Sequence, residues 1–360
     1  MHRIALFAWF LATGSTALGQ CLVPTDLIVS GGPGKDGIPS LTNPEVVTRA
    51  VADSFMRDDD MVLGVVINGE ARAYPHGILW WHEIVNDVLG GRPILVTFCP
   101  LTGSGIVYDP VFDGSARNFG VSGLLFDNNL IMFDRTTDSL WSQMRLDSIC
   151  GAMSGTRPPL VPVVQSTWAA WKTLQPETTV VSRDTGFARN YTVYPYGSYD
   201  DIASTQLLFP HTTLDGRLPM KENVLGITHE GVSRAYSMTR MTTAGPRLAI
   251  NDDVNGRPVL VVHDALGKLV VPFDRRLPAP PENPQAERKR LTFDVLPSDA
   301  ILFQLQDRET GSVWNLNGVA VAGPLQGERL QKIATFTSFW FAMASFRPGT
   351  EIHGIGASEP

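Results

Sequence analysis

The sequence contains few cysteines and, after its first residues, no long apolar segment. Only Cys21, Cys99 and Cys150 occur in 360 residues. Three cysteines allow one disulfide and one free thiol in an oxidising compartment, and their number does not say which two pair. No later stretch approaches the roughly 20 apolar residues that a membrane-spanning helix needs. The sequence therefore argues against a transmembrane segment.

Basic clusters are also missing. The formal net charge is -7, and the one basic run, Arg288-Lys289-Arg290, follows a proline-rich stretch and is typical of a solvated loop. A protein that tracks phosphates needs a larger patch of lysine and arginine, so nucleic acid is excluded as the expected partner. The apolar fraction is that of ordinary globular proteins, and about 340 mature residues suffice for two domains.

The N-terminal segment (1–19) has the pattern of a secretory signal peptide. Met1-His2-Arg3 is followed by an apolar stretch from Ile4 to Leu11, and Ala17-Leu18-Gly19 resembles a cleavage site. We therefore expect an exported protein, periplasmic or extracellular. A cysteine directly after the cut is typical of bacterial lipoproteins, but Gln20 precedes Cys21 where that pattern needs a small residue. This argues against a lipid anchor at Cys21.

The rest of the chain contains an internal repeat. Three groups of residues recur in the second half in the same order: Val62-Leu63-Gly64-Val65 with Arg72-Ala73-Tyr74 as Val224-Leu225-Gly226-Ile227 with Arg234-Ala235-Tyr236, Gly91 to Val96 as Gly256 to Val261, and Asp134-Arg135 with Trp141 as Asp307-Arg308 with Trp314. Matches in one order over most of each half predict a tandem duplication. The expected organisation is a signal peptide (1–19), an N-terminal segment (20–57), module 1 with the candidate site (58–182), a Tyr/Gly-rich connector (183–220) and a degenerate module 2 (221–360).

Within each copy the local signals are mostly those of strands and turns. Asn68-Gly69 lies between two short strand patterns, and residues 93–98 are typical of a buried strand. The best helix signal is Ser166 to Leu174, with a counterpart at Ser338 to Ser345. The predicted fold class is α+β, built from two tandem, mostly antiparallel β modules that each contain one or two short helices.

A turn at Gly90-Gly91 would pair residues whose numbers sum to 181, which places His82 directly opposite Cys99. The equivalent pair in the second copy is Arg247 opposite Asp264. A His-Cys pair suits three chemistries: a thiolate nucleophile with His82 as base, a soft-metal site for which copper is the natural candidate outside the cytoplasm, or a redox thiol. The alternative is a small buried thiol beside a hydrogen-bonded core histidine.

Comparison of the two copies separates further candidates. Residues confined to the first copy are candidates for function: Trp80, Trp81 and Asn128 for ligand binding, and Gln143 either to orient a ligand or an attacking water, or to hydrogen-bond a loop carbonyl. Glu83 falls on the opposite strand face from His82, so we do not expect it to complete a triad. Cys150 is expected to be a buried structural thiol. Residues that recur in both copies are expected to be structural: Asp134, Arg135 and Trp141, with an Asp-Arg ion pair that braces a turn.

Several motifs resemble one known family. Arg72-Ala73-Tyr74-Pro75, Trp81 to Asp87, Val96 to Leu101 and Leu140 to Gln143 are similar to the family catalogued as domain of unknown function 3179, most closely over residues 60–210. Its members typically carry Cys-Pro-Leu-Cys-Gly-Thr, whereas this chain reads Cys99-Pro100-Leu101-Thr102-Gly103-Ser104. The missing second cysteine argues against a two-thiol cycle or a Cys-x-x-Cys metal clamp.

The leading hypothesis is thus a His82/Cys99-centred pocket for thiol chemistry or soft-metal binding, with a small molecule or a metal as partner. The alternative is a non-catalytic extracellular module that binds a ligand or a partner, in which Trp80, Trp81 and the tyrosines of the connector matter more than Cys99.

Overall fold

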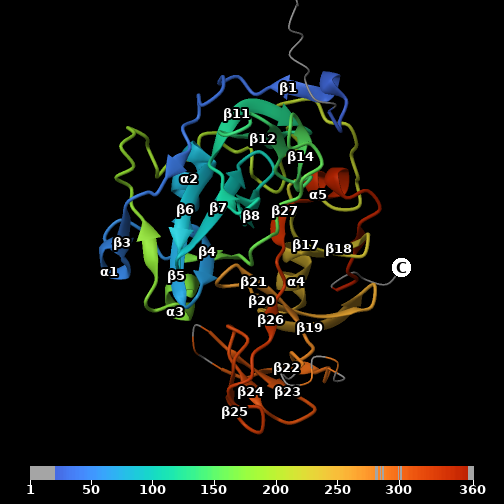
Figure 1. Cartoon of the computed structure of the whole chain (residues 1–360). Helices are drawn as coiled ribbons and strands as arrows, with labels where there is room; N and C mark the ends of the chain where they lie inside the picture. The colour runs from blue at the N-terminus through green and yellow to red at the C-terminus, as the bar shows by residue number, and fades with distance from the viewer. Residues whose placement is uncertain are drawn as a thin grey trace, which may run out of the picture.

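The computed structural model describes residues 21–279, 283, 285, 288–298, 300 and 302–355. The predicted signal peptide (1–19) lies outside these residues. The fold is rich in β-structure, with several mostly antiparallel sheets and few, short helices (Figure 1). None of the helices in the described part of the chain is both long and apolar enough to cross a membrane.

The elements that position the candidate site follow one another closely in the first half. Asn68 and Gly69 adopt positive φ angles of 49° and 87°, and Gly90 and Gly91 have φ angles of 54° and 73°. Both pairs form the tight two-residue hairpin turns that such dipeptides favour. The elements are β4 (Met61–Ile67), β5 (Glu70–Pro75), α2 (His76–His82), β6 (Ile84–Leu89), β7 (Arg92–Cys99) and β8 (Ser104–Tyr108).

A five-stranded antiparallel sheet packs over this hairpin region, and further short elements complete the first half. The sheet has the order β1 (Ile28–Ser30), β11 (Phe119–Phe126), β12 (Asn129–Asp134), β13 (Leu140–Ser142), β14 (Asp147–Cys150). The other elements are η1 (Thr25–Leu27), β2 (Leu41–Thr42), β3 (Val46–Thr48), α1 (Arg49–Ala52), β9 (Val111–Phe112), β10 (Ser115–Ala116), β15 (Val164–Thr167), α3 (Trp168–Leu174) and β16 (Thr179–Val181).

Helix α3 confirms the strongest helix signal of the sequence. It begins at Trp168, and Thr167 acts as its N-cap by accepting a hydrogen bond from the Ala170 N–H. Trp168 and Trp171 lie on its buried face. The predicted counterpart, Ser338 to Ser345, is also largely helical, in α5 (Trp340–Phe346).

The second half repeats much of this element order. Its elements are β17 (Asn223–His229), β18 (Val232–Ser237), α4 (Met238–Ala244), β19 (Arg247–Val254), β20 (Arg257–Asp264), β21 (Leu269–Asp274), β22 (Phe293–Leu296), β23 (Gln304–Asp307), β24 (Val313–Trp314), β25 (Ala320–Ala322), β26 (Gln331–Lys332), β27 (Phe336–Phe339), α5 (Trp340–Phe346) and β28 (Glu351–Ile352). Leu63 pairs with Tyr74 in the first half, and Leu225 pairs with Tyr236 in the second.

The two halves interlock rather than form separate sheets. A nine-stranded sheet combines β19, β20, β21 and β26 of the second half with β15, β4, β5, β16 and β3 of the first, and β15 pairs with both β4 and β21. On the other side β27 lies beside β8 (Figure 1), where the Phe339 N–H donates to the Thr102 carbonyl at 2.8 Å. The corresponding Thr167 N–H donates to the Gly267 carbonyl at 2.8 Å. The two halves therefore share the nine-stranded sheet and are joined by further backbone hydrogen bonds outside it.

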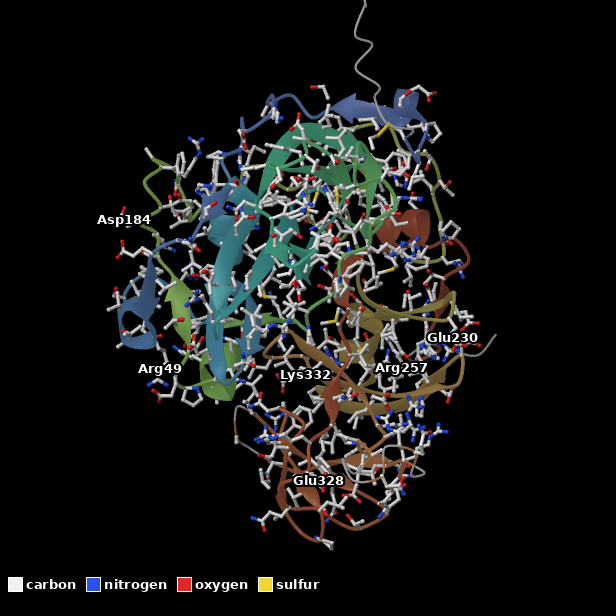
Figure 2. All side chains as sticks on the ribbon, viewed as in Figure 1. Arg49, Asp184, Glu230, Arg257, Glu328 and Lys332 are labelled. Carbon is white, nitrogen blue, oxygen red and sulfur yellow. A yellow bond between two sulfur atoms is a disulfide. The ribbon has the colours of Figure 1, made fainter. Side chains whose placement is uncertain are left out.

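One disulfide joins Cys21 to Cys150, at the outer end of the five-stranded sheet (Figure 2). Cys150 is buried, but the expectation that it is a thiol was wrong, because its partner lies 129 residues away in the sequence and nothing local marks it. Cys99 is the free cysteine, and it is buried. Charged side chains such as Arg49 and Glu230 lie at the periphery of the molecule (Figure 2).

Candidate functional site

The hairpin of β6 and β7 has the predicted register but ends earlier than the sequence suggested. Pairs run from Leu89↔Arg92 to Ile84↔Thr97, and the pairing of His82 with Cys99 does not form. His82 instead ends helix α2, and Glu83 follows with a φ angle of 56°. That prediction was wrong because the helix occupies the residues that would have extended the strand.

The second half shows why the two copies differ here. Helix α4 ends at Ala244 and strand β19 begins only at Arg247, so the second half has a longer connection between helix and strand. There the predicted pair of Arg247 and Asp264 does form, with an ion pair of 3.2 Å. In the first half Glu83 alone makes the connection.

His82 is fully buried and both of its ring nitrogens are occupied. Nδ1 lies 2.7 Å from the Pro39 carbonyl, and Nε2 lies 2.8 Å from the Tyr191 hydroxyl. Burial lowers the pKa of the imidazole. His82 therefore holds the connector in place as a neutral ring and has no nitrogen left to serve Cys99 as a base or to share a metal with it.

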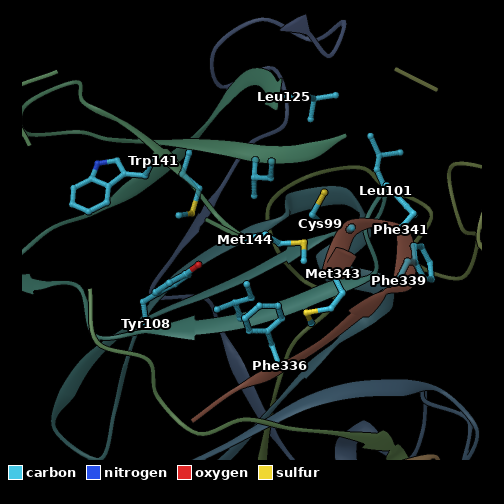
Figure 3. Packing of buried hydrophobic residues seen from close by; sticks show 14 of the residues in the cluster. Cys99, Leu101, Tyr108, Leu125, Trp141, Met144, Phe336, Phe339, Phe341 and Met343 are labelled. Carbon is cyan, nitrogen blue, oxygen red and sulfur yellow. The ribbon is translucent and has the colours of Figure 1, made fainter. Parts of the chain in front are cut away.

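Cys99 lies in the hydrophobic core, among Leu101 and Met144 (Figure 3). Its side chain is 1% exposed, and its Sγ lies 3.7 Å from the Asn128 carbonyl. Burial, followed by the charge of the nearby Glu83 carboxylate, raises the pKa of the thiol to about 11. Since a reactive cysteine needs its thiolate form, this environment suits an inert thiol.

Glu83 lies between helix α2 and strand β6, with a φ angle of 56°. A left-handed backbone is unusual for a bulky residue without glycine's freedom. It is held by two backbone hydrogen bonds, from its own N–H to the Leu79 carbonyl at 2.8 Å and from the Phe98 N–H to its carbonyl at 2.7 Å. The fold thus fixes the direction of the Glu83 side chain.

The carboxyl group of Glu83 receives no hydrogen bond from a described residue. The residue as a whole is 6% exposed. Burial alone raises its pKa to about 8. Removal from water disfavours the charged form of a carboxyl group. Glu83 therefore carries a proton at neutral pH and can donate a hydrogen bond.

Glu83 lines a cavity of about 230 Å³. We call it the Glu83 cavity. Apart from Glu83 and Tyr196, the lining is apolar or glycine: Gly31, Pro33, Ile38, Leu101, Val121, Gly123, Leu124, Leu125, Leu130, Leu208 and Phe209. Empty apolar cavities of about 150 Å³ already admit molecules the size of benzene. This cavity therefore has room for a small organic ligand.

The predicted connector closes this side of the molecule. Residues 183–220 contain no helix or strand, yet several of their side chains bind the Cys99 loop. The Tyr194 hydroxyl donates to the Pro100 carbonyl at 3.2 Å, and the Tyr199 hydroxyl donates to the Leu101 carbonyl at 3.0 Å. The tyrosines thus hold the connector over the Cys99 loop by their hydroxyl groups.

Asn128 fixes the far end of the connector. Its side-chain amide donates to the carbonyls of Phe209 and Pro210 at 3.0 and 3.1 Å and accepts from the Phe209 N–H at 3.0 Å. Phe209 lines the Glu83 cavity, so Asn128 shapes that cavity indirectly. These three bonds use both donors of its amide, and Asn128 does not itself line the Glu83 cavity.

Gln143 is also fully buried and fully bonded. Its Oε1 accepts from Ser104 at 2.8 Å and from Asn129 at 2.7 Å, and its Nε2 donates to Thr97 at 2.9 Å and to the Ser104 carbonyl at 3.1 Å. These four bonds use all the hydrogen-bonding capacity of the amide. The geometry matches the structural alternative for Gln143, a bond to a carbonyl.

The two neighbouring tryptophans have different surroundings. The Trp81 indole N–H donates to the Asn190 carbonyl of the connector at 3.0 Å. Trp80 meets Tyr194 edge to face, with ring centroids 5.2 Å apart, and lines a different cavity from Glu83. Of the two tryptophans predicted to bind a ligand, Trp80 therefore lines a cavity, and Trp81 is hydrogen-bonded to the connector.

Asp134 organises the turn after β12, as expected of a structural residue, but not through its sequence neighbour. It accepts hydrogen bonds from the Thr137 N–H at 2.7 Å and from the Trp141 indole at 3.1 Å, and it pairs with Arg117 at 3.3 Å. Arg135 pairs instead with Asp36 at 2.6 Å on the surface. The predicted ion pair within the Asp-Arg dipeptide was wrong, because adjacent side chains point apart.

We expect Asp134→Ala to lower the free energy of unfolding by about 3 kcal/mol, because it leaves a buried indole N–H and an arginine without their acceptor. Urea unfolding followed by tryptophan fluorescence measures this loss. Arg135→Ala is the matched control and should cost less than about 1 kcal/mol, since its ion pair is half exposed. Equal losses from the two variants would contradict this assignment.

Potential metal ligands are scattered. Over residues 21–279 and the described parts of 283–355, no three His, Cys, Asp or Glu side chains come together in a way that could hold a metal ion. The two ligands predicted for copper, His82 and Cys99, do not face each other. The geometry therefore gives the copper hypothesis no support.

Sequence reasoning missed Glu83, although one signal could have identified it. Tyr74 recurs as Tyr236 and Asn86 recurs as Asn251, so the stretch between the two matched residues is longer in the second copy. Because the two copies differ in length here, a strand register counted from the Gly90-Gly91 turn is not secure for residues before Asn86. The assignment of Glu83 to the opposite face from His82 depended on that register.

Comparison with known proteins finds one match. No curated protein and no solved structure matches the chain. A family model described as a protein of unknown function (DUF3179) matches residues 35–350. This match covers most of both halves, the connector and Glu83, and it confirms the resemblance of the sequence motifs. The chain belongs to the DUF3179 family.

Proposed function

We propose that this chain is an exported binding protein that holds a small, neutral, largely apolar molecule in the Glu83 cavity. The observation that carries the proposal is the carboxyl of Glu83, which belongs to a largely buried residue, has no partner among the described residues and lines an apolar cavity. Buried polar groups normally have a hydrogen-bond partner. A bound ligand would supply it.

The chemistry of the cavity indicates what the ligand carries. Because the pKa of Glu83 is raised to about 8, its carboxyl is a hydrogen-bond donor at neutral pH. A ketone, ester or alcohol oxygen accepts such a bond. The remaining lining favours a hydrocarbon body, and Leu101, Leu130 and Phe209 would pack against it.

The surroundings of Cys99 favour a non-catalytic binding protein over thiol chemistry. The high pKa and burial of Cys99 keep it in the thiol form, and His82 uses both ring nitrogens elsewhere. Thiol catalysis needs a thiolate and a base within reach. Cys99 then serves as a small apolar side chain behind the cavity.

Two further parts of the hypothesis have structural support. The Cys21–Cys150 disulfide is of the kind that persists in oxidising compartments, which favours export to the periplasm or beyond. It also uses the sulfur to which a lipid would be attached. The recurrence of Leu63↔Tyr74 as Leu225↔Tyr236, and of Val85↔Val96 as Ile250↔Val261, favours a tandem duplication.

Titration calorimetry with 2-octanone tests this function. We expect saturable binding at pH 6.5 with a Kd of about 100 µM or lower. Glu83→Gln keeps an N–H donor of the same size and should retain binding within about fivefold. Glu83→Leu removes the polar anchor and should weaken binding at least about tenfold. Glu230→Gln, which changes a glutamate on an exposed turn outside the cavity, is the matched control and should bind as the wild type does.

The pH dependence provides a second readout. Binding that needs the proton of Glu83 should weaken in the wild type as pH rises above about 8, and Glu83→Gln should show no such decline. Octylamine distinguishes the other option for a buried carboxyl, an ion pair. If octylamine binds and 2-octanone does not, or if Glu83→Leu binds 2-octanone as the wild type does, the proposal is wrong.

A further inference from the structure

Two further cavities lie where the two halves of the chain meet, separate from the Glu83 cavity. One, of about 230 Å³, includes His76, Trp80, Phe98 and Tyr194 in its lining, and we call it the aromatic arm. The other, of about 280 Å³, includes Met238, Thr242, His263 and Val270, and we call it the polar arm. Both arms are lined by Met61, Gln165, Asn223 and Lys268. They therefore form one groove across the contact between the halves.

Equivalent positions of the two halves line the two arms. The ladder pair Phe98↔Gly105 of the first half corresponds, in the internal repeat, to His263↔Val270 of the second. The side chains at these positions differ. Where the first half has Trp80, Phe98 and Gly103, the second has Thr242, His263 and Lys268. One arm is thus mainly aromatic and the other mainly polar, and the positive charge of Lys268 lies where they meet.

His263 gives the polar arm a buried polar ring. The residue is 1% exposed, and its Nε2 lies 3.1 Å from the Thr242 hydroxyl. Its Nδ1 is buried without a well-formed hydrogen bond among the described residues, and the Leu269 backbone is an acceptor close to the ring. His263 and Thr242 therefore make this side of the groove polar.

The junction of the arms adds further donors. The Gln165 Oε1 accepts a hydrogen bond from Thr337 at 2.8 Å, which leaves its amide N–H groups for other partners. Lys268 is exposed, and no carboxylate of the described residues forms an ion pair with it. No aspartate or glutamate lines the polar arm, whereas Asp200 lines the aromatic arm. An excess of donors without a carboxylate favours an acceptor with negative charge.

The aromatic arm suits the rest of such a molecule. Trp80 and Tyr194 form an edge-to-face pair, and Phe98 packs against the His76 ring with centroids 4.4 Å apart. His76 is 6% exposed, and its Nε2 is buried without a partner among the described residues. Burial lowers the pKa of His76 to about 3, so the ring is neutral and adds no charge to this arm.

We propose that the groove between the halves binds a small aromatic anion, with its carboxylate or phosphate beside Lys268, Gln165 and His263 and its ring beside Trp80. The site is distinct from the Glu83 cavity and does not depend on the function proposed for it.

Titration calorimetry with indole-3-acetate, phenyl phosphate and the neutral indole-3-acetamide tests this proposal. We expect at least one of the two anions to bind saturably at low ionic strength and the amide to bind at least about tenfold more weakly. The comparison of indole-3-acetate with phenyl phosphate shows which acid group the arm takes. Binding should weaken as salt is added, because Lys268 is exposed.

Two variants locate the anion. Lys268→Gln should weaken binding of the preferred anion at least about fivefold, and Lys289→Gln, which removes the same charge from an exposed loop outside the groove, should not. Trp80→Ala should weaken the aromatic anion but not the binding of inorganic phosphate or acetate. Glu83→Gln should leave all of these values unchanged. Equal binding of the anions and the amide, or an unchanged Kd in Lys268→Gln, would overturn the proposal.

Discussion

Glu83→Gln is expected to change the pH dependence of stability more than any other single substitution at the candidate site. Burial raises the pKa of Glu83 from 4.5 to about 8. Between these values the folded protein keeps a proton that the unfolded chain has lost, so a rise in pH favours unfolding. The stability linked to Glu83 is full below about pH 4.5 and is lost as pH rises to about 8.

The size of the effect follows from the rise of the Glu83 pKa from 4.5 to about 8. At about 1.4 kcal/mol for each pH unit between these values, the upper limit is about 5 kcal/mol. Glutamine has no proton to lose. The free energy of unfolding of Glu83→Gln minus that of the wild type should therefore increase by several kcal/mol between pH 4 and pH 9.

Urea unfolding at pH 4, 6 and 9 measures this difference. His76 acts in the opposite direction, because its lowered pKa removes stability as pH falls from about 6.5 to about 3. Both proteins contain His76, so its contribution cancels in the difference. Glu230→Gln, at a mostly exposed side chain, controls for the loss of one carboxylate. A difference that stays constant with pH would show that Glu83 is ionised in the folded protein.

Removal of the Cys21–Cys150 disulfide should cause the second large effect. The bond joins residues that are 129 positions apart. Closing a loop of this length restricts the unfolded chain, and the associated stability is about 3 to 5 kcal/mol. The double variant Cys21→Ser, Cys150→Ser should lose this amount relative to the oxidised wild type.

The reducing agent separates this bond from the third cysteine. Wild type and Cys99→Ala should both lose stability when dithiothreitol is added, by similar amounts. The double serine variant should not respond to it. If the wild type is equally stable with and without dithiothreitol while its two thiols react with a labelling reagent, the disulfide contributes nothing to stability.

The register of the β6–β7 hairpin illustrates how far local sequence reaches. Gly90-Gly91 sets the turn, and every pair from Leu89↔Arg92 to Ile84↔Thr97 follows from it. The same reasoning placed Arg247 opposite Asp264 correctly. It failed at His82, because the end of helix α2 competes for the same residues and a difference in loop length between the copies hid that competition.

The pairing of cysteines and the surroundings of Gln143 were beyond any local pattern. Cys150 meets Cys21 because the segment before β1 runs beside β14, where the Leu22 N–H donates to the Ile149 carbonyl at 2.8 Å. Gln143 is saturated by Thr97, Ser104 and Asn129, which come from three different strands or strand ends. Such contacts arise from packing between distant segments.

The sequence by itself determined the family, the β-rich antiparallel character, the hairpin turns and the capped helix that begins at Trp168, because turns and caps depend on neighbouring residues. The tertiary structure decided which ionisable side chain matters. Glu83 is buried because the connector, which lies far from it in the sequence, closes over its cavity with Tyr196 and Phe209. Burial and pKa depend on what packs against a residue, and here the packing comes from a segment with no strand or helix of its own.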